Sequence, residues 1–407
     1  MTSTPSPSPS PDPDRLRIVV PRYGPRVIGG VETLARQLAR SLHGGGWQVE
    51  VWTTCAVDAQ TWANAGPPGT AEEEGIRVRR FAVRRRRAPA AFRQASRVFF
   101  RLPPRLRPER AWIVAQGPYT PGLIAALAAA PASPTLFMPY LYFPTLRGLS
   151  AAAGARLMLP AAHDELPLRL RAVGGAVATA GGLLYSTEEE RALLERAHPV
   201  ARDKPSAVGA VGVDPPPLPQ PQRFRRRLGL EGDYLLYGGR ATPGKGLEEL
   251  LAGMSVLRQR HPDAQLVLTG EAGQAAPPQP GVVRAGRLAE EERWDAIAGA
   301  AAVVVPSFHE SLSLLALEAW SLGRPALLNA ASPALAGQGA RSGAAMTYRG
   351  AGELAAAAAS LLTDRGRAAA LGEAGRGYVA ATYRWELVHE RLRRLIAGAE
   401  AGDGRAV

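Results

Sequence analysis

The chain has one cysteine, two lysines and no long apolar segment free of proline. With Cys55 alone no disulfide can form within the chain, which fits a reducing cytoplasm. The first residues, MTSTPSPSPSPDPD, contain neither the basic nor the apolar region of a signal peptide. They predict a disordered Pro/Ser tail over residues 1–14. We therefore expect a cytoplasmic protein.

Charged residues are absent from Ala111 to Leu146, which raises the question of a membrane span. Prolines interrupt this segment, and its longest proline-free piece, Gly122–Ala130, is shorter than the roughly 20 residues that a spanning helix needs. A buried strand, a helix and a second strand explain the segment better. The apolar runs AWIVA (111–115) and PTLFM (134–138) are the expected strands.

The formal net charge is +13, and of the 49 lysines and arginines only Lys204 and Lys245 are lysines. Such an arginine bias is typical of a codon effect, so the position of the charge is more informative than its amount. Between residues 76 and 110 there are thirteen arginines and one acid, Glu109. This segment carries nearly the whole excess of positive charge.

Within this basic segment, residues 89–103 combine an apolar stripe with a row of arginines. The stripe consists of Ala91, Phe92, Ala95, Val98, Phe99 and Leu102, and the row of Arg93, Arg97 and Arg101. The spacing predicts a basic amphipathic helix for an anionic membrane surface. A solvated arginine face packed on the first domain is the alternative. Nucleic acid is not an expected partner, because no recognised binding module accompanies the charge.

The length of 407 residues fits two domains, and apolar runs alternate with helical patterns along the chain. A proline-rich linker over residues 213–222 separates two such series. We predict an α/β protein with two Rossmann-like, doubly wound parallel-sheet domains, residues 15–205 and 206–384, followed by a crossover helix and tail over 385–407. Two such domains imply a cleft, with ligands at the carboxyl ends of the strands.

Two carboxylates mark the helix expected within residues 306–327. Glu318 has mainly leucines three and four positions away, and a carboxylate on that face is costly unless it is paired or hydrogen-bonded. It is either salt-bridged or accepts hydrogen bonds from vicinal hydroxyls of a ligand. Glu310, at the start of the helix, either caps it or holds a sugar beside a phosphate at the helix N-terminus.

The stretch YGGRATPGKGLEELL (237–251) predicts a strand, a glycine-rich turn and a helix. Gly239 to Lys245 match the start of a P-loop, but Gly246 replaces the hydroxyl residue that would bind Mg²⁺. A nucleoside triphosphatase is therefore a weak alternative. What remains is an anion site with Arg240 and Lys245 on a loop whose glycines permit close backbone approach.

In the first half, Gly29 and Gly30 stand at a helix start after the first strand, in a tight turn or near a phosphate or acceptor. The pattern is not the dinucleotide fingerprint G-x-G-x-x-G. His163, in HDE (163–165), follows a strand and is a candidate because it would face the cleft, although a lone histidine is usually structural. No Cys/His cluster is present, and the D-x-D in the tail (residues 12–14) is attributed to chance, so no metal site is expected.

Taken together, these motifs resemble the retaining, nucleotide-sugar-dependent glycosyltransferases of family 4, which have the GT-B fold. The matching motifs, in the order of the family, are GGVE (29–32), HDE (163–165), VGVD (211–214), GGRATPGKGLEELL (238–251) and E-x7-E (310–318). Each alone is weak, but five in register over residues 15–395 are specific.

The resemblance implies a role for each matching position. Arg240 and Lys245 would bind the donor diphosphate, Glu318 the ribose, and Glu310 the transferred sugar, with His163 near the reacting sugar. The other positions implied at the donor are Gly29, Gly30, Gly239, Ser311, Leu312, Ser313 and Leu314. The substrate would be a UDP- or GDP-sugar, transferred with retention to an unidentified acceptor, without cofactor or metal.

Two other functions stay open at this point. One is a catalytically silent protein of the same fold that binds a sugar nucleotide or polyanion, but no charged motif residue is missing. The other is a phosphorylase of the GT-B fold, which would need a phosphate site or a pyridoxal lysine. The scarcity of lysine argues against the pyridoxal lysine.

Overall fold

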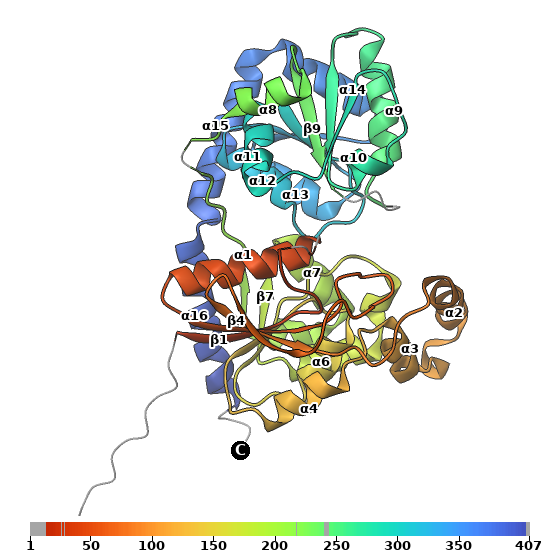
Figure 1. The fold of residues 1–407 in the computed structure, drawn as a ribbon, viewed down its shortest axis with the longest axis vertical. Coiled ribbons are helices and arrows are strands. Elements are labelled where there is room, and N and C mark those ends of the chain that lie inside the picture. Colours follow the sequence, from red (N-terminus) through yellow and green to blue (C-terminus); the bar gives the residue numbers. More distant parts are fainter. Residues whose placement is uncertain (1–13, 26, 28, 217, 240–243, 404–407) are drawn as a thin grey trace, which may run out of the picture. The chain divides into compact units, whose positions relative to one another are not determined.

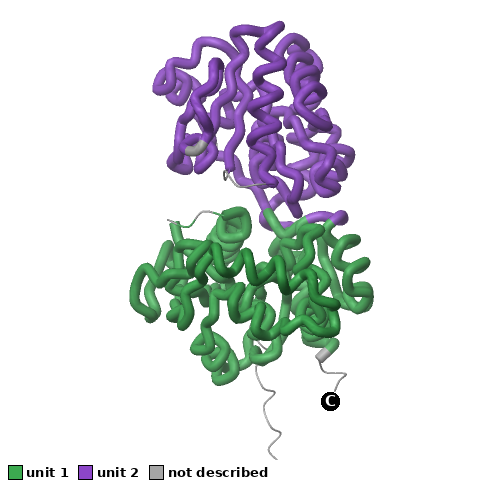
Figure 2. Tube along the Cα trace, turned by 90° about the vertical axis from the view of Figure 1, so that its right-hand side faces the viewer, with its two compact units in different colours: residues 1–186, 190–211, 388–407 green, residues 187–189, 212–387 purple. Residues whose placement is uncertain are grey.

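The computed structural model describes residues 14–403 except 26, 28, 217 and 240–243. The chain forms two compact units, each drawn in its own colour in Figure 2. Unit 1 contains the described residues up to Ser186, then 190–211 and those from Val388 onward, and unit 2 contains residues 187–189 and 212–387. The predicted N-terminal tail lies outside the described residues, apart from Asp14.

Unit 1 is built on one sheet of eight strands in the order β3-β4-β2-β1-β5-β6-β7-β8. All neighbouring strands are parallel except the β3–β4 pair. The strands are β1 (Arg15–Val19), β2 (Gln48–Thr54), β3 (Gly69–Glu73), β4 (Ile76–Phe81), β5 (Thr135–Phe137), β6 (Arg156–Met158), β7 (Gly182–Tyr185) and β8 (Ser206–Val208). Strands β5 and β7 are buried along their whole length, as expected for a parallel sheet covered on both faces.

Helices cover this sheet (Figure 1). They are α1 (Gly30–Gly44), α3 (Glu109–Gln116), α4 (Pro121–Ala129), α5 (Phe143–Gly148), α6 (Arg171–Thr179) and α7 (Glu188–Ala197), with short 3-10 turns at Pro104–Leu106, Leu166–Arg169 and Pro199–Asp203. Helix α2 (Pro89–Arg101) lies to the side and packs on α3. Helix α1 has the predicted buried face, with Leu34, Leu38 and Leu42 on one side. Strands β2 to β4 lie on one side of β1 and strands β5 to β8 on the other, so the order in which strands join the sheet switches between β1 and β5. Doubly wound sheets bind ligands at such a switch point.

Unit 2 has a sheet of six parallel strands in the order β11-β10-β9-β12-β13-β14. The strands are β9 (Tyr234–Gly238), β10 (Gln265–Thr269), β11 (Val282–Gly286), β12 (Ala302–Val305), β13 (Ala326–Asn329) and β14 (Ala345–Tyr348). The helices are α8 (Pro221–Leu228), α9 (Leu247–Arg258), α10 (Ala272–Ala275), α11 (Glu290–Gly299), α12 (Leu314–Ser321), α13 (Pro333–Ser342), α14 (Gly350–Thr363) and α15 (Arg365–Thr382). The switch point here lies between β9 and β12.

The last helix, α16 (Trp385–Asp403), begins in unit 2 and continues in unit 1. Within unit 1, His389 Nε2 lies 2.9 Å from Ser41 Oγ, and Arg393 Nε donates to Asp14 Oδ1 at 3.0 Å. Leu392 and Leu395 of α16 are also buried. The two doubly wound parallel sheets predicted from the sequence are thus confirmed.

One predicted strand is wrong. Residues 111–115 lie in α3, not in a strand. Trp112, Ile113 and Gln116 are buried, a spacing that fits one face of a helix. A five-residue apolar run cannot separate a buried strand from a buried helical turn, and the deciding signal was Glu109 just after Pro108, an acid in the first helical turn.

The amphipathic helix predicted for residues 89–103 exists as α2, but its aromatic residues are engaged. Phe99 is buried and stacks on Trp112 of α3, with ring centroids 5.5 Å apart, and Phe92 also packs on Trp112. Val98 remains 53% exposed, beside the exposed arginine row. Across the described part of the chain, no helix is both long and apolar enough to span a bilayer.

Candidate functional site

At the switch point of unit 2, the loops that follow β9 and β12 lie against each other. Strands β9 and β12 are parallel neighbours, so their carboxyl ends share one edge of the sheet. Phe308 N donates to Gly244 O at 2.9 Å, and Lys245 Nζ lies 2.6 Å from Glu310 Oε1. The structure therefore brings two of the predicted site residues together in an ion pair.

Gly246 explains why this loop departs from a P-loop. Its φ is +71°, and a Cβ atom added there would lie 2.0 Å from the backbone oxygen of Pro306. Neither serine nor threonine fits such a position, because a side chain would meet the backbone and the left-handed conformation is costly for residues other than glycine. The missing hydroxyl is a consequence of the close packing of the two loops.

The segment after Glu310 leads into α12. Ser311 and Ser313 are buried, whereas Leu312 and Leu314 are half-buried. The leucine side chains are apolar, so the polar groups that this segment can offer to a ligand are mainly those of its backbone. Ser313 caps the helix, its Oγ accepting from Ala316 N at 3.3 Å. Backbone N–H groups at the start of a helix lack partners within it and favour anions. This edge of unit 2 can therefore accommodate negative charge beside Lys245.

Glu318 is 3% exposed on α12, and its carboxylate forms an ion pair with Arg293 of α11. This pairing corresponds to the salt-bridged alternative of the sequence analysis. Arg293 also lies over the Trp294 ring, 5.1 Å from its centroid. Sequence reasoning missed Arg293, and the only available signal was that a buried Glu318 required a cationic or hydrogen-bonding partner.

The other glycine-rich positions differ in what they require. Gly239 follows β9, and a Cβ added there would lie 2.7 Å from Tyr237 Oη. Arg240 lies outside the described residues. In unit 1, a Cβ on Gly29 would meet Glu32 Oε2 at 2.0 Å, whereas one on Gly30 would have open space. A side chain at position 29 would thus displace the carboxylate of Glu32.

That glutamate is held by Arg22, with which it forms a largely buried ion pair. Arg22 Nη1 also donates to Val57 O at 2.9 Å, which ties the end of β1 to the loop after β2. Because Gly30 starts α1, its position follows β1 at the edge of the sheet where the switch point lies. The GGVE motif therefore forms a fixed turn at this edge.

His163 lies half-buried in the loop after β6, the strand next to β5. A buried acid from α7 holds this loop. Glu190 accepts from Ala162 N at 2.8 Å and from Ser186 N at 2.6 Å. Burial raises the pKa of Glu190 to about 7, against these hydrogen bonds, which lower it. Glu190 was not identified from the sequence as a support of the His163 loop, because Glu190 and Ala162 are 28 positions apart and come together only in the fold.

Chemically, the edge of unit 2 offers a compact ammonium, a carboxylate next to it and helix N–H groups, which together suit an anionic ligand that carries hydroxyls. No group of three or more His, Cys, Asp or Glu side chains with metal-binding geometry occurs among the residues that the structure describes. Lys245, Glu310 and residues 311–314 thus form one cluster, and Gly29, Gly30 and His163 lie in unit 1.

Two family descriptions match the chain. Residues 29–210 match the glycosyl transferase 4-like domain, and residues 232–364 match the glycosyl transferases group 1. A curated relative is the GDP-mannose-dependent monoacylated alpha-(1-6)-phosphatidylinositol monomannoside mannosyltransferase of Corynebacterium glutamicum, which is 26% identical over 215 residues. This match covers 49% of the chain and 56% of the relative. The chain spans about half the length of the curated relatives it matches.

Solved structures resemble the chain over nearly its full length. Sucrose-phosphate synthase from Thermosynechococcus elongatus superposes with a TM-score of 0.68 at 20% identity, over 96% of this chain and 100% of that one. Anabaena HepE in complex with UDP and glucose gives a TM-score of 0.67 at 13% identity, over 97% and 100%. At such identities these likenesses establish the fold alone.

Proposed function

The chain belongs to the group 1 glycosyltransferases with a glycosyl transferase 4-like N-terminal domain and the GT-B fold, and we propose that it moves a sugar from a nucleotide-diphosphate sugar to an acceptor. The observation that carries this proposal is the Lys245–Glu310 pair at the switch point of unit 2. A diphosphate leaving group develops negative charge as the glycosidic bond breaks, and a fixed cation there lowers the barrier.

In this proposal the cations and the carboxylate bind different parts of the donor. Lys245, with Arg240, stabilises the departing diphosphate, and Glu310 exchanges its lysine partner for hydroxyls of the sugar. The helix N–H groups of residues 311–314 contribute to phosphate and sugar binding. Transfer proceeds on one face with retention, the departing diphosphate helping to deprotonate the acceptor, and protein cations take the place of a divalent metal.

Glu318 and His163 complete the proposed arrangement. Glu318 combines both alternatives of the sequence analysis in this proposal: its pairing with Arg293 holds the carboxylate in a fixed orientation, and the carboxylate also accepts hydrogen bonds from the ribose. His163 lies near the reacting sugar, with Glu190 fixing its loop through Ala162 N. The names of two similar proteins favour a nucleotide sugar as donor, one being GDP-mannose-dependent and the other crystallised with UDP and glucose.

A panel of UDP-, GDP- and dTDP-sugars, measured by thermal shift, tests the donor. We expect sugar nucleotides with one of these three bases to raise the melting temperature. A ligand at about 100 times its Kd adds about 2.7 kcal/mol to the free energy of unfolding. Release of the nucleoside diphosphate from that donor then separates an enzyme from a silent binding protein. A panel in which no donor shifts the melting temperature contradicts the proposal.

We also propose that α2 attaches the protein to an anionic membrane surface. Support comes from the exposed side chains of Val98 (53%) and Leu106 (69%), which lie among exposed arginines. Ion pairs of Arg93, Arg97 and Arg101 with acids are absent among the described residues. A mixed surface of this kind suits the boundary between headgroups and acyl chains.

Replacing Arg93, Arg97 and Arg101 by glutamine should weaken co-sedimentation with phosphatidylglycerol vesicles about 100-fold at low salt, since each arginine near the surface contributes about 1 kcal/mol. The matched control replaces Arg260, Arg367 and Arg394, which are exposed on other elements and remove the same charge. If vesicle binding weakens equally in both variants, the loss is due to the change in net charge alone, and α2 has no specific role.

A further inference from the structure

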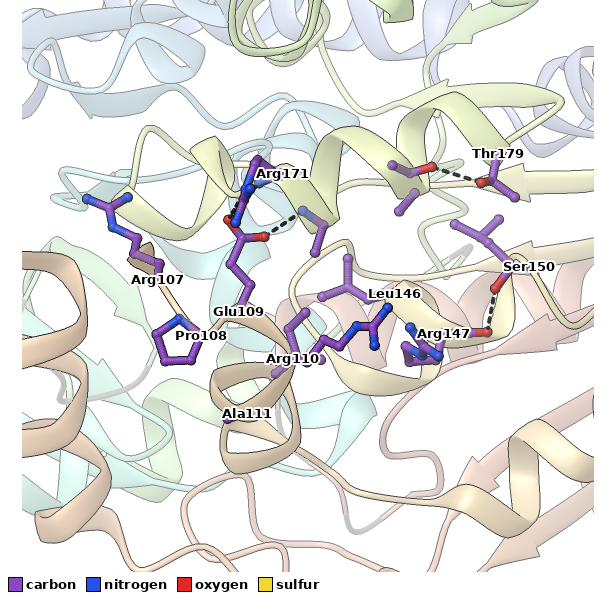
Figure 3. A pocket seen from close by; sticks show the side chains of 15 residues that line it. Arg107, Pro108, Glu109, Arg110, Ala111, Leu146, Arg147, Ser150, Arg171 and Thr179 are labelled. Atoms are coloured by element: carbon purple, nitrogen blue, oxygen red, sulfur yellow. Dashed lines mark hydrogen bonds and ion pairs between the residues drawn. The ribbon is translucent and has the colours of Figure 1, made fainter. Parts of the chain in front are cut away.

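An open cavity of about 750 Å³ lies in unit 1, where α3, α5 and α6 meet (Figure 3). Its apolar lining includes Ile113 of α3, Leu146 of α5 and Ala176 of α6. None of the residues of the GGVE and HDE motifs line it, and it belongs to a different unit from Lys245 and Glu310. The cavity therefore shares no lining residue with the proposed donor site.

Four arginines line this cavity, and their charge is only partly compensated by its single acid, Glu109. Glu109 is already engaged, because its carboxylate accepts from Arg171 N at 3.1 Å and Ala172 N at 2.8 Å at the start of α6. It also pairs with the Arg171 side chain, Nε to Oε1 at 3.4 Å. One acid thus serves both a helix N-terminus and one arginine.

The remaining arginines have no acid to neutralise them within the described part of the chain. Arg107 donates to Leu102 O and Phe100 O, backbone carbonyls that carry no net charge. Arg110 and Arg147 are exposed, and neither has an ion-pair partner among the described residues. Figure 3 shows the Arg110 side chain extending across the cavity in the direction of Arg147.

An apolar lining beneath uncompensated guanidinium groups has a defined chemical complement. Guanidinium groups bind phosphate and carboxylate through paired charge-assisted hydrogen bonds. The apolar wall provides contact for a hydrocarbon part of the same ligand. We propose that this cavity binds an amphiphilic anion, with its phosphate at Arg110 and Arg147 and its apolar part against Leu146 and Ala176.

The test uses hexyl phosphate as probe and the full-length protein, with calorimetry as readout. The wild-type protein is expected to bind hexyl phosphate more tightly than inorganic phosphate, because only the former contacts the apolar wall. Replacing Arg110 and Arg147 by glutamine should weaken hexyl phosphate binding at least about tenfold, the effect of losing one charged hydrogen bond. The control Arg260→Gln/Arg367→Gln removes the same charge from exposed positions of unit 2 and should bind as the wild type does.

A second pair of variants guards against a folding defect. Gly175 lines the cavity on α6, and a Cβ atom there meets nothing within 4 Å. Gly175→Asp should therefore fold and weaken hexyl phosphate binding by placing a negative charge in the cavity, whereas Gly175→Asn, of the same size, should not. Failure of hexyl phosphate to bind, or equal binding by Gly175→Asp and Gly175→Asn, overturns the proposal.

Vesicles with phosphatidylglycerol identify the source of the anion. If hexyl phosphate competes with these vesicles, and the competition is lost in Arg110→Gln/Arg147→Gln, the ligand is a lipid headgroup. If it binds without competing, the ligand is a soluble amphiphile. Both results support the cavity site, and neither depends on sugar transfer.

Discussion

Replacing Lys245 by alanine is expected to lower donor turnover by about 10²–10³-fold, the usual effect of removing one group that stabilises transition-state charge. The ammonium lies 2.6 Å from Glu310 Oε1 at the switch point of unit 2, where a leaving diphosphate would develop charge. The loss should appear in kcat, because the charge on the leaving group grows in the transition state. Nucleoside diphosphate release from the donor that binds is the measurement.

The chain provides its own control for this experiment. Lys204, the other lysine, donates to Ala178 O at 2.6 Å and belongs to unit 1, whereas Lys245 belongs to unit 2. Lys204→Ala should keep wild-type turnover, and melting curves of both variants check that unit 2 stays folded. Turnover in Lys245→Ala within a factor of about three of the wild type would remove Lys245 from the mechanism.

Substituting alanine for Gly246 should destabilise unit 2 by about 2–5 kcal/mol, as expected for a buried backbone clash combined with a strained conformation. The new Cβ atom would lie 2.0 Å from Pro306 O, a backbone atom that cannot rotate away. Relief of the clash requires the loops after β9 and β12 to separate, which would also displace Lys245 from Glu310. Urea denaturation, together with the thermal shift by the donor, measures both effects.

Gly343 isolates the contribution of the backbone conformation. It also has positive φ (+59°) and lies in unit 2, but the nearest atom to an added Cβ is Ala374 Cβ at 3.9 Å. Gly343→Ala should cost only the left-handed penalty of about 1–2 kcal/mol and leave donor binding intact. A loss of stability no greater in Gly246→Ala than in Gly343→Ala would argue against the close packing of the two loops.

The fold was predictable because parallel sheets buried on both faces produce strong local signals. Runs such as Leu235–Tyr237 and Val303–Val305 are continuously apolar, and helical segments separate them. The family resemblance and the GT-B architecture predicted from motifs were likewise confirmed. The prediction failed at residues 111–115, where a short apolar run is compatible with either a strand or a helix.

Within the candidate site, glycine spacing and the two carboxylates were visible in the sequence, but their partners were not. Arg293 and Glu318 are 25 positions apart, and Glu190 reaches Ala162 across 28 positions. Such pairs form only after strands and helices have assembled, and arginines are too numerous here for any one of them to stand out. The roles of Arg240, Lys245, Glu310 and His163 remain predictions, and Arg240 lies outside the described residues.

The interlocking of Gly244–Gly246 with Pro306–Glu310 also constrains enzyme engineering. A hydrogen bond from Phe308 N to Gly244 O and the close contact between Gly246 and Pro306 hold the two loops together, so that the conformation of each depends on the other. Exchanging either loop alone with that of a relative would create a mismatch in packing. A chimaera designed to change the ligand proposed for this edge would have to transplant both loops together.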